Sequence, residues 1–299
     1  MLSNVFLKSL RDERWPMVWW SAGLGLFAAM MIAFFPSIRG NDDFNVMLES
    51  YPENLKTLFG LSELTDITSA VGFFNAEIFG FMAPLLFVIH GVVLGSGAIA
   101  GEEGRGSLEI LLSEPIARGK LVVQKAAAMI ANAISLGLVL WIVLVIGTLI
   151  IDIDLRVLHL AAITFSTVLL GVTFGALAFA AGCFTGSRGT SVAIVAAVAV
   201  GTYLLNAASG IVSYMEAAKW LSPFFYYNAA NPLANGLNPA HAAALLATIA
   251  ILLVAGCGSD DETAASPGPG SLVVYSGRSD DLVAPIIEQF KDTTGIDVK

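Results

Sequence analysis

Six long runs of apolar residues alternate with short polar segments along the chain. They cover Trp15–Phe35, Phe79–Ala100, Ala126–Ile151, Leu158–Phe184, Ser191–Ala208 and Pro239–Ala255. A bilayer core about 30 Å thick needs about 20 mostly apolar residues per helix, since lipid offers no partner to an unpaired backbone group. The short link Asp152–Val157 requires the third and fourth runs to form an antiparallel hairpin. The pattern therefore predicts an all-α membrane protein built on a six-helix transmembrane bundle.

Composition supports a lipid environment. Hydrophobic residues make up 56% of the 299 positions and charged residues only 13%, whereas soluble domains carry about a quarter charged residues. The net charge of −9 argues against nucleic acid as a partner. Two cysteines and three histidines form no disulfide framework and no zinc-binding spacing, so no metal site is expected.

Lysine and arginine residues near the ends of the runs predict the orientation. The segment 40–69, between the first and second runs, holds six acidic residues and one basic residue, Lys56, which places it on the side opposite the basic residues. The first run is too long for a cleaved signal peptide, which is the alternative, and Phe34-Phe35-Pro36 closes it. We expect a multi-pass protein of a bacterial or archaeal plasma membrane with a cytoplasmic N-terminus, on the side of the basic residues Lys8, Arg11, Arg14, Arg105, Arg118, Lys120, Lys125 and Arg188.

The segment before the first run, Leu2–Arg11, has apolar and basic positions at helical spacing. Val5, Phe6 and Leu10 would share one face, with Lys8 and Arg11 near its edge. This spacing favours an amphipathic helix lying along the cytoplasmic interface. A frayed tail is the alternative.

The connection Ala100–Lys125, after the second run, is the most informative part of the chain. Gly101 and Gly104 loosen the chain, Ser107–Leu112 forms a short amphipathic turn, and Pro115 ends it. A short charged helix with an apolar face is suited to docking in a groove of another protein. An ordinary interfacial loop is the alternative interpretation.

This connection resembles the signature of type-2 ATP-binding-cassette (ABC) exporter permeases, and the resemblance extends over about residues 1–250. The later segments Ser222–Asn228 and Asn231-Pro232-Leu233 resemble this family too. The positions that carry the signature, and that the resemblance assigns to ATPase coupling, are Glu102, Glu103, Arg105, Gly106, Leu108, Glu109, Leu111, Leu112, Pro115 and Arg118. Gln124, together with this helix, would contact the ATPase.

The resemblance implies a transporter subunit that is not itself an enzyme and binds no cofactor directly. A separate cytoplasmic ABC ATPase subunit would bind ATP, and a second permease copy, in a homodimer or heterodimer, would complete the pathway. Consistent with this, the sequence has no G-x-x-x-x-G-K-[ST] phosphate loop and no convergent catalytic set. A multi-span assembly protein without transport is an alternative function.

Among the polar residues inside the predicted spans, three are singled out as the most expensive to place in lipid, where they must find partners. They are His90, Asn132 and Asn206. They would line a translocation path or form interhelical hydrogen bonds. The small residues of the fourth and fifth spans, among them Gly171, Gly175 and Gly201, permit close helix contact, either inside the bundle or at a dimer seam.

The C-terminal residues have a different character from the six-span domain, which we place at 1–256. Residues 257–271 predict a flexible linker, and 272–299 predict a truncated β-α-β unit. The sequence around Cys257 resembles a lipoprotein processing site, and residues 272–299 resemble the start of a periplasmic ferric-iron-binding lipoprotein. The metal ligands of that family have no counterpart here, so no iron site is carried over. A membrane-tethered solute-binding fragment is the corresponding alternative function.

This change from an apolar six-span pattern to an acidic linker and a β-α-β pattern suggests that two reading frames are joined between about His241 and Ala255. A natural fusion and an assembly artefact both remain open, as does the side of the membrane on which the C-terminus lies.

Overall fold

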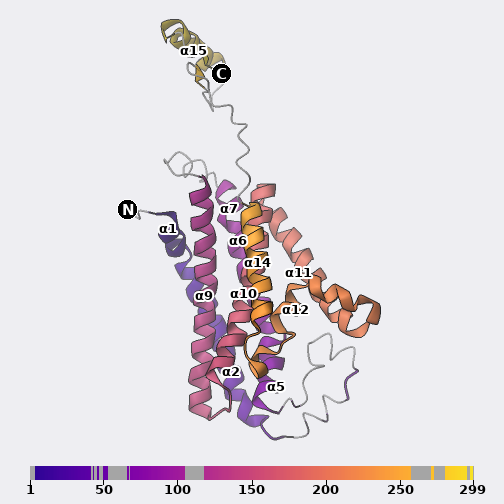
Figure 1. The fold of residues 1–299 in the computed structure, drawn as a ribbon. Coiled ribbons are helices and arrows are strands. Elements are labelled where there is room, and N and C mark those ends of the chain that lie inside the picture. Colours follow the sequence, from indigo (N-terminus) through magenta and orange to yellow (C-terminus); the bar gives the residue numbers. More distant parts are fainter. Residues whose placement is uncertain are drawn as a thin grey trace. The chain divides into compact units, whose positions relative to one another are not determined.

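The computed structural model describes residues 4–41, 43, 46, 50–52, 66, 68–104, 118–256, 271–272, 280–294 and 297–298. The chain divides into two compact units, Met1–Cys257 and Gly258–Lys299. In the first unit, the described helices run roughly side by side as a long bundle (Figure 1). Six of the described segments are long and apolar enough to span a membrane, which confirms the predicted bundle.

The first half of the bundle contains the first two spans and the short elements next to them. α1 (Val5–Asp12) is amphipathic and precedes α2 (Arg14–Phe34), which ends in the 3-10 turn η1 (Phe35–Ser37). The second span is not one continuous α-helix: α5 (Ala70–Phe74) passes through the π-helical turn η2 (Asn75–Phe79) into α6 (Met82–Ala98). One helical turn, α7 (Ala100–Glu103), follows α6. This span therefore starts earlier in the sequence than the apolar run alone predicted.

The second half begins with the longest helix. α9 (Arg118–Ile151) begins before the predicted apolar run and continues through the third span. α10 (Val157–Thr185), α11 (Arg188–Ile211) and α14 (Pro239–Gly256) are the remaining spans. Between α11 and α14 lie the 3-10 segment η3 (Ser213–Leu221) and the short helices α12 (Pro223–Asn228) and α13 (Pro232–Asn235).

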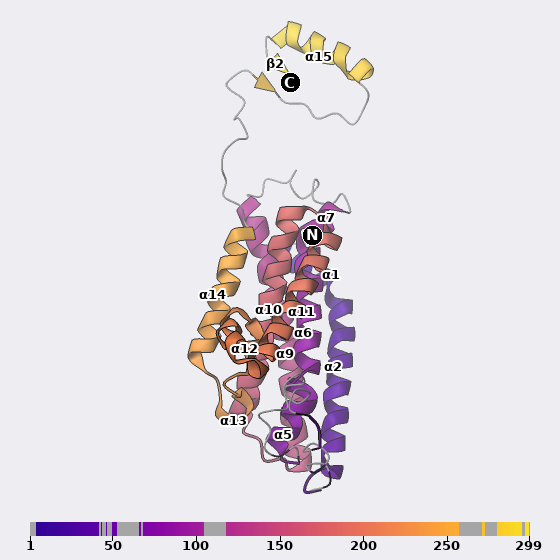
Figure 2. The same cartoon turned by 90° about the vertical axis from the view of Figure 1, so that its right-hand side faces the viewer.

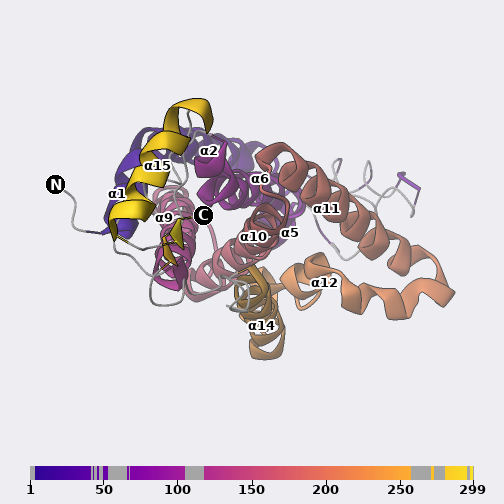
Figure 3. The same cartoon turned by 90° about the horizontal axis from the view of Figure 1, so that it is seen from above.

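α10 is the central helix, packed against α6, α9, α11 and α14 (Figure 3). Of its most apolar 18-residue window, 83% is buried, against 17% for that of α11. Glycines on both partners bring α6 and α10 into backbone contact. A Cβ atom added to Gly91 would overlap the carbonyl oxygen of Gly171, and one added to Gly95 would overlap that of Gly175. Two facing small-xxx-small pairs thus form one seam, as membrane helices do where backbones approach closely.

α11 diverges from the bundle, and η3 and α12 return from its end toward α10 (Figures 1 and 3). The α10–α11 corner turns at Gly186, whose φ of +61° suits glycine, and Ser187 caps α11 by accepting from the Thr190 amide. At the opposite end, Arg39 Nη1 donates to the Asp152 carbonyl at 3.2 Å. This bond joins the end of the first span to the α9–α10 hairpin.

The second unit has its own small parallel pairing. β1 (Ser271–Leu272) pairs with β2 (Asp297–Val298), and α15 (Asp280–Thr294) connects them (Figure 2). This is the β-α-β connectivity that the sequence predicted. The resemblance to a solute-binding lipoprotein stays a prediction, and Cys257 lies outside the described residues.

Candidate functional site

The end of the bundle that carries α1, α7 and the first turns of α9 and α11 is called the coupling end here. Glu102 of α7 and Lys125 of α9 form an ion pair with Nζ and Oε1 2.7 Å apart. Both side chains are largely shielded, with exposed fractions of 13% for Glu102 and 9% for Lys125. The pair therefore attaches α7 to α9 from inside and leaves little of the Glu102 carboxylate for an outside partner.

Glu103 points to the other side of α7 and is exposed. Its carboxylate lies beside Gly186, where an added Cβ would come within 3.2 Å of both carboxylate oxygens. Arg188 lies along the other glycines of this region, with its guanidinium carbon 3.9 Å from a Cβ position on Gly97. The α10–α11 corner thus packs closely against α6 and α7.

A cavity of about 290 Å³ opens between α1, α2, α6 and α9 at the coupling end. Its polar walls include Asn132, whose Nδ2 donates to the Ala128 carbonyl one turn earlier at 2.8 Å. Asn132 was one of the expected pathway residues, and the structure gives it both a helix-internal hydrogen bond and a place on a cavity wall. The charged residues of the lining are Asp12, Glu13, Glu102, Lys125 and Arg188.

Gln124 precedes Lys125 on α9 and contacts α1. Its Oε1 accepts from the backbone N–H groups of Val5 at 2.9 Å and Phe6 at 3.3 Å. The contact expected between Gln124 and an ATPase stays a prediction, and nothing in the local sequence pattern indicated that α1 would be a partner of Gln124.

Most of the expected coupling segment lies outside the described residues. This holds for Arg105, Gly106, Leu108, Glu109, Leu111, Leu112 and Pro115, while Arg118 begins α9 but its side chain is not described. The structure does place the two ends of this segment, Gly104 and Arg118, at the coupling end. The roles of these residues stay predictions.

His90 of α6 is buried, with 3% of its surface exposed. Its ring packs edge-on against Trp20 of α2, with the ring centroids 5.2 Å apart. Neither ring nitrogen has a hydrogen-bond partner among the described residues. His90 therefore lies in the α2–α6 contact, and it does not join Asn132 or Asn206 on a common cavity wall.

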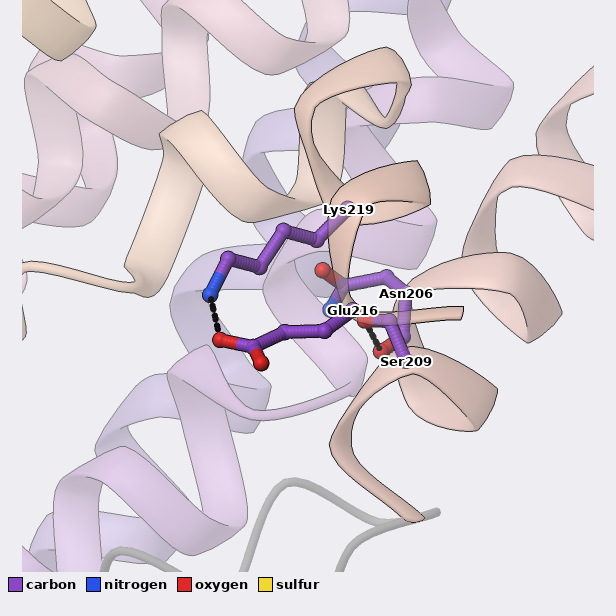
Figure 4. A network of polar contacts seen from close by, with 4 residues as sticks. All are labelled: Asn206, Ser209, Glu216 and Lys219. Carbon is purple, nitrogen blue, oxygen red and sulfur yellow. Dashed lines mark hydrogen bonds and ion pairs between the residues drawn. The ribbon is translucent and has the colours of Figure 1, made fainter. Parts of the chain in front are cut away.

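Asn206 lies on a different cavity, of about 300 Å³, between α6, α11 and α12. Three aromatic side chains, Phe81, Tyr203 and Phe224, line one wall of this cavity. Tyr203 makes edge-on contacts with Phe81 and Phe224, with the ring centroids 6.4 and 5.4 Å apart. Figure 4 shows Asn206 near the end of α11, where its carbonyl accepts from Ser209 Oγ at 2.7 Å and the nearby Lys219 pairs with Glu216. The aromatic wall was not predicted, because its members come from three separate segments.

Tyr227 fixes α12 against the second span. Its hydroxyl donates to the Phe79 carbonyl at 2.7 Å, and burial raises the pKa of this phenol above its ordinary value, so it stays a donor. The Phe79 carbonyl lies at the end of the π-turn, where regular helical bonding is interrupted. The hydrogen bond therefore stabilises the irregular part of span two and the floor of the α6–α11–α12 cavity together.

Within the described ranges, no group of three or more His, Cys, Asp or Glu side chains is arranged to hold a metal ion. The cavity between α6, α11 and α12 is mainly apolar, with amide and phenol groups in its wall.

These features define a polytopic helical membrane protein with six candidate spans, of which α10 is the central one. Comparison with protein families gives the particular group: the profile described as ABC-2 family transporter protein matches residues 4–259, and the chain belongs to this family. It is thus a membrane subunit of an ABC transporter, a kind of subunit that is generally not catalytic itself. The match continues through all of α14, past the region 241–255 where a join was expected. No curated protein matches the chain.

Proposed function

We propose that this chain is the transmembrane subunit of an ABC exporter that couples to a separate cytoplasmic ATPase subunit, which binds the ATP. The observation that carries the proposal is the family match, together with the arrangement of the coupling end. There α7 and α9 flank the segment 105–117 and are attached to each other by the Glu102–Lys125 ion pair. Because both ends of the segment 105–117 continue into attached helices, a displacement of this segment by a partner would be transmitted to the membrane spans.

The distribution of basic residues supports a cytoplasmic coupling end. Lys8, Lys120, Lys125 and Arg188 all lie at this end of the bundle, whereas Arg39 and Arg156 lie at the opposite end, beside the α9–α10 hairpin. Lysine and arginine residues are retained on the cytoplasmic side during insertion. We therefore propose a bacterial or archaeal plasma-membrane protein with a cytoplasmic N-terminus.

A second permease copy is part of the proposal because α11 presents an exposed face. Ala193, Ala197, Val200, Gly201 and Leu204 recur at helical spacing, and all are exposed; they are called the α11 stripe here. Small residues let two membrane helices approach closely. The stripe adjoins the cavity that Val200 and Asn206 line, so a partner there would cover the cavity and make it part of a shared pathway.

The coupling role is tested by co-purification of this chain with a co-expressed ABC ATPase subunit. Charge reversal of the exposed Glu103, in Glu103→Arg, combined with Arg105→Glu, is expected to abolish co-purification of the two subunits. The physical reason is that charge complementarity selects the docking partner, while like charges oppose it.

The matched control is Glu216→Lys, which reverses an exposed charge in η3, away from the coupling end. It should leave association unchanged. Intact association of the Glu103→Arg, Arg105→Glu variant would reject the docking role of this segment.

A further inference from the structure

α1 begins with backbone groups that its own helix cannot satisfy. The first four N–H groups of any helix lack an intrahelical partner. Asn4 Oδ1 accepts from the Leu7 amide at 2.8 Å in the usual capping geometry. The backbone N–H groups of Val5 and Phe6 donate instead to Gln124 Oε1, a side chain of α9. The start of α1 is therefore attached to α9 through one side-chain oxygen.

The next residue of α9 makes a second attachment. Lys125 Nζ meets Glu102 Oε1 of α7 at 2.7 Å, with both side chains shielded from solvent. Successive residues of an α-helix project about 100° apart, because 3.6 residues complete a turn. Gln124 and Lys125 can thus hold different neighbours, α1 and α7, from the same turn of α9.

Neither neighbour is fixed by its own chain connections. The helix breaks at Ile99 between α6 and α7, and Gly104 directly follows α7. α1 is separated from α2 by Glu13, where the helix is interrupted. Both elements lie beside α9 at the coupling end (Figure 1). Side-chain bonds to α9 therefore add to the packing that holds each short helix beside the long span.

We propose that Gln124 and Lys125 are positioning residues that form a double attachment, making α1, α7 and α9 move as one body. The inference deepens the proposed function and rests on it. A displacement of the segment 105–117 reaches α7 through Gly104 and α9 through Arg118. The double attachment keeps these two ends in register and carries the interfacial helix α1 with them.

The mechanical part of the proposal is tested without the ATPase, by distances between spin labels in the full chain reconstituted in vesicles. Cys183 and Cys257 are first replaced by serine. Labels at Lys8→Cys and Lys120→Cys report α1 against α9, and labels at Gly104→Cys and Lys120→Cys report α7 against α9. We expect a narrow distance distribution for each pair in the otherwise unchanged chain.

The substitutions come in matched pairs. Gln124→Ala removes the acceptor and should broaden the α1–α9 distribution, while Gln124→Glu keeps an oxygen acceptor near the positive end of α1 and should retain it. Lys125→Ala should broaden the α7–α9 distribution, and the exchange Glu102→Lys with Lys125→Glu should restore it. Narrow distributions in Gln124→Ala and Lys125→Ala would overturn the proposal.

The coupling part is measured as substrate-independent ATP turnover of the purified permease–ATPase complex in vesicles. In Gln124→Ala the ATPase should stay bound, while turnover stimulated by the permease falls about fivefold, the factor expected for one net hydrogen bond. Gln124→Glu should restore the turnover. A purely structural role would lower the amount of complex and leave turnover per complex unchanged.

Unchanged turnover per complex in Gln124→Ala would therefore overturn the coupling part. If the unmodified chain binds no ATPase, the proposed function fails instead, and the label distances still decide whether the double attachment exists.

Discussion

At the scale of single residues, glycines that look alike in the sequence lie in different surroundings. Gly91, Gly95, Gly171 and Gly175 lie where α6 and α10 meet backbone to backbone, whereas Gly201 of α11 has no atom within 4 Å of its Cβ position. The sequence showed that the fourth and fifth spans are rich in small residues, but both internal packing and a dimer seam were open. The structure assigns those of α10 to internal packing, because α10 is surrounded by other helices.

This difference gives a matched prediction about stability. Gly95→Ala places a methyl group against the Gly175 carbonyl and should lower the free energy of unfolding by about 1–3 kcal/mol, the usual cost of overpacking. Gly201→Ala should have no such cost. The midpoint of thermal unfolding in detergent measures both. Equal midpoints for the two variants would contradict the α6–α10 seam.

A second residue-scale prediction concerns the tyrosines of α12. Tyr227→Phe leaves the Phe79 carbonyl without its donor inside the protein, which should cost about 1–3 kcal/mol of unfolding free energy. The neighbouring Tyr226→Phe removes an exposed hydrogen bond to the Trp220 carbonyl and should cost less. Denaturant titration of both variants compares them, and a larger effect of Tyr226→Phe would contradict the role of Tyr227.

At the scale of elements, the apolar runs predicted each span but not its irregularities. The π-turn η2 comes just before the predicted apolar run, and the break before α6 lies inside it; length and hydropathy carry no information about the hydrogen-bond spacing at either place. The outward course of α11 was also not predictable. Its apolar faces look alike in sequence, and only the packing of α10 shows which of them stays uncovered.

The α11 stripe leads to a cross-linking prediction. In a chain whose two cysteines are replaced by serine, Ala197→Cys should form a disulfide-linked dimer on oxidation in the membrane, because the stripe meets its counterpart in a second copy. The control is Ile251→Cys on α14, which is 68% exposed and lies outside the stripe. Cross-linking of Ile251→Cys alone would place the second copy on a different face.

At the scale of the whole molecule, the six spans place both the start of α1 and the end of α14 at the coupling end. The described basic residues are concentrated there, which supports the proposed cytoplasmic position of this end. The second unit, 258–299, has its own parallel β pairing and lies almost entirely beyond the family match.

The orientation predicts opposite labelling of two lysine positions by a membrane-impermeant maleimide in intact cells. Lys219→Cys should react, and Lys120→Cys should react only after the membrane is permeabilised. The reverse pattern would place the coupling end outside the cell and remove the basis for ATPase coupling.

The sequence by itself determined the number of spans, the hairpin of the third and fourth, and the motif around Glu102 and Glu103. These properties depend on local apolar length and on residues adjacent in the chain. Only the tertiary structure decided that Glu102 pairs inward with Lys125, that Gln124 holds α1, and that α11 keeps an open stripe. Each of these depends on which helices become neighbours, and that is set by packing between segments far apart in the sequence.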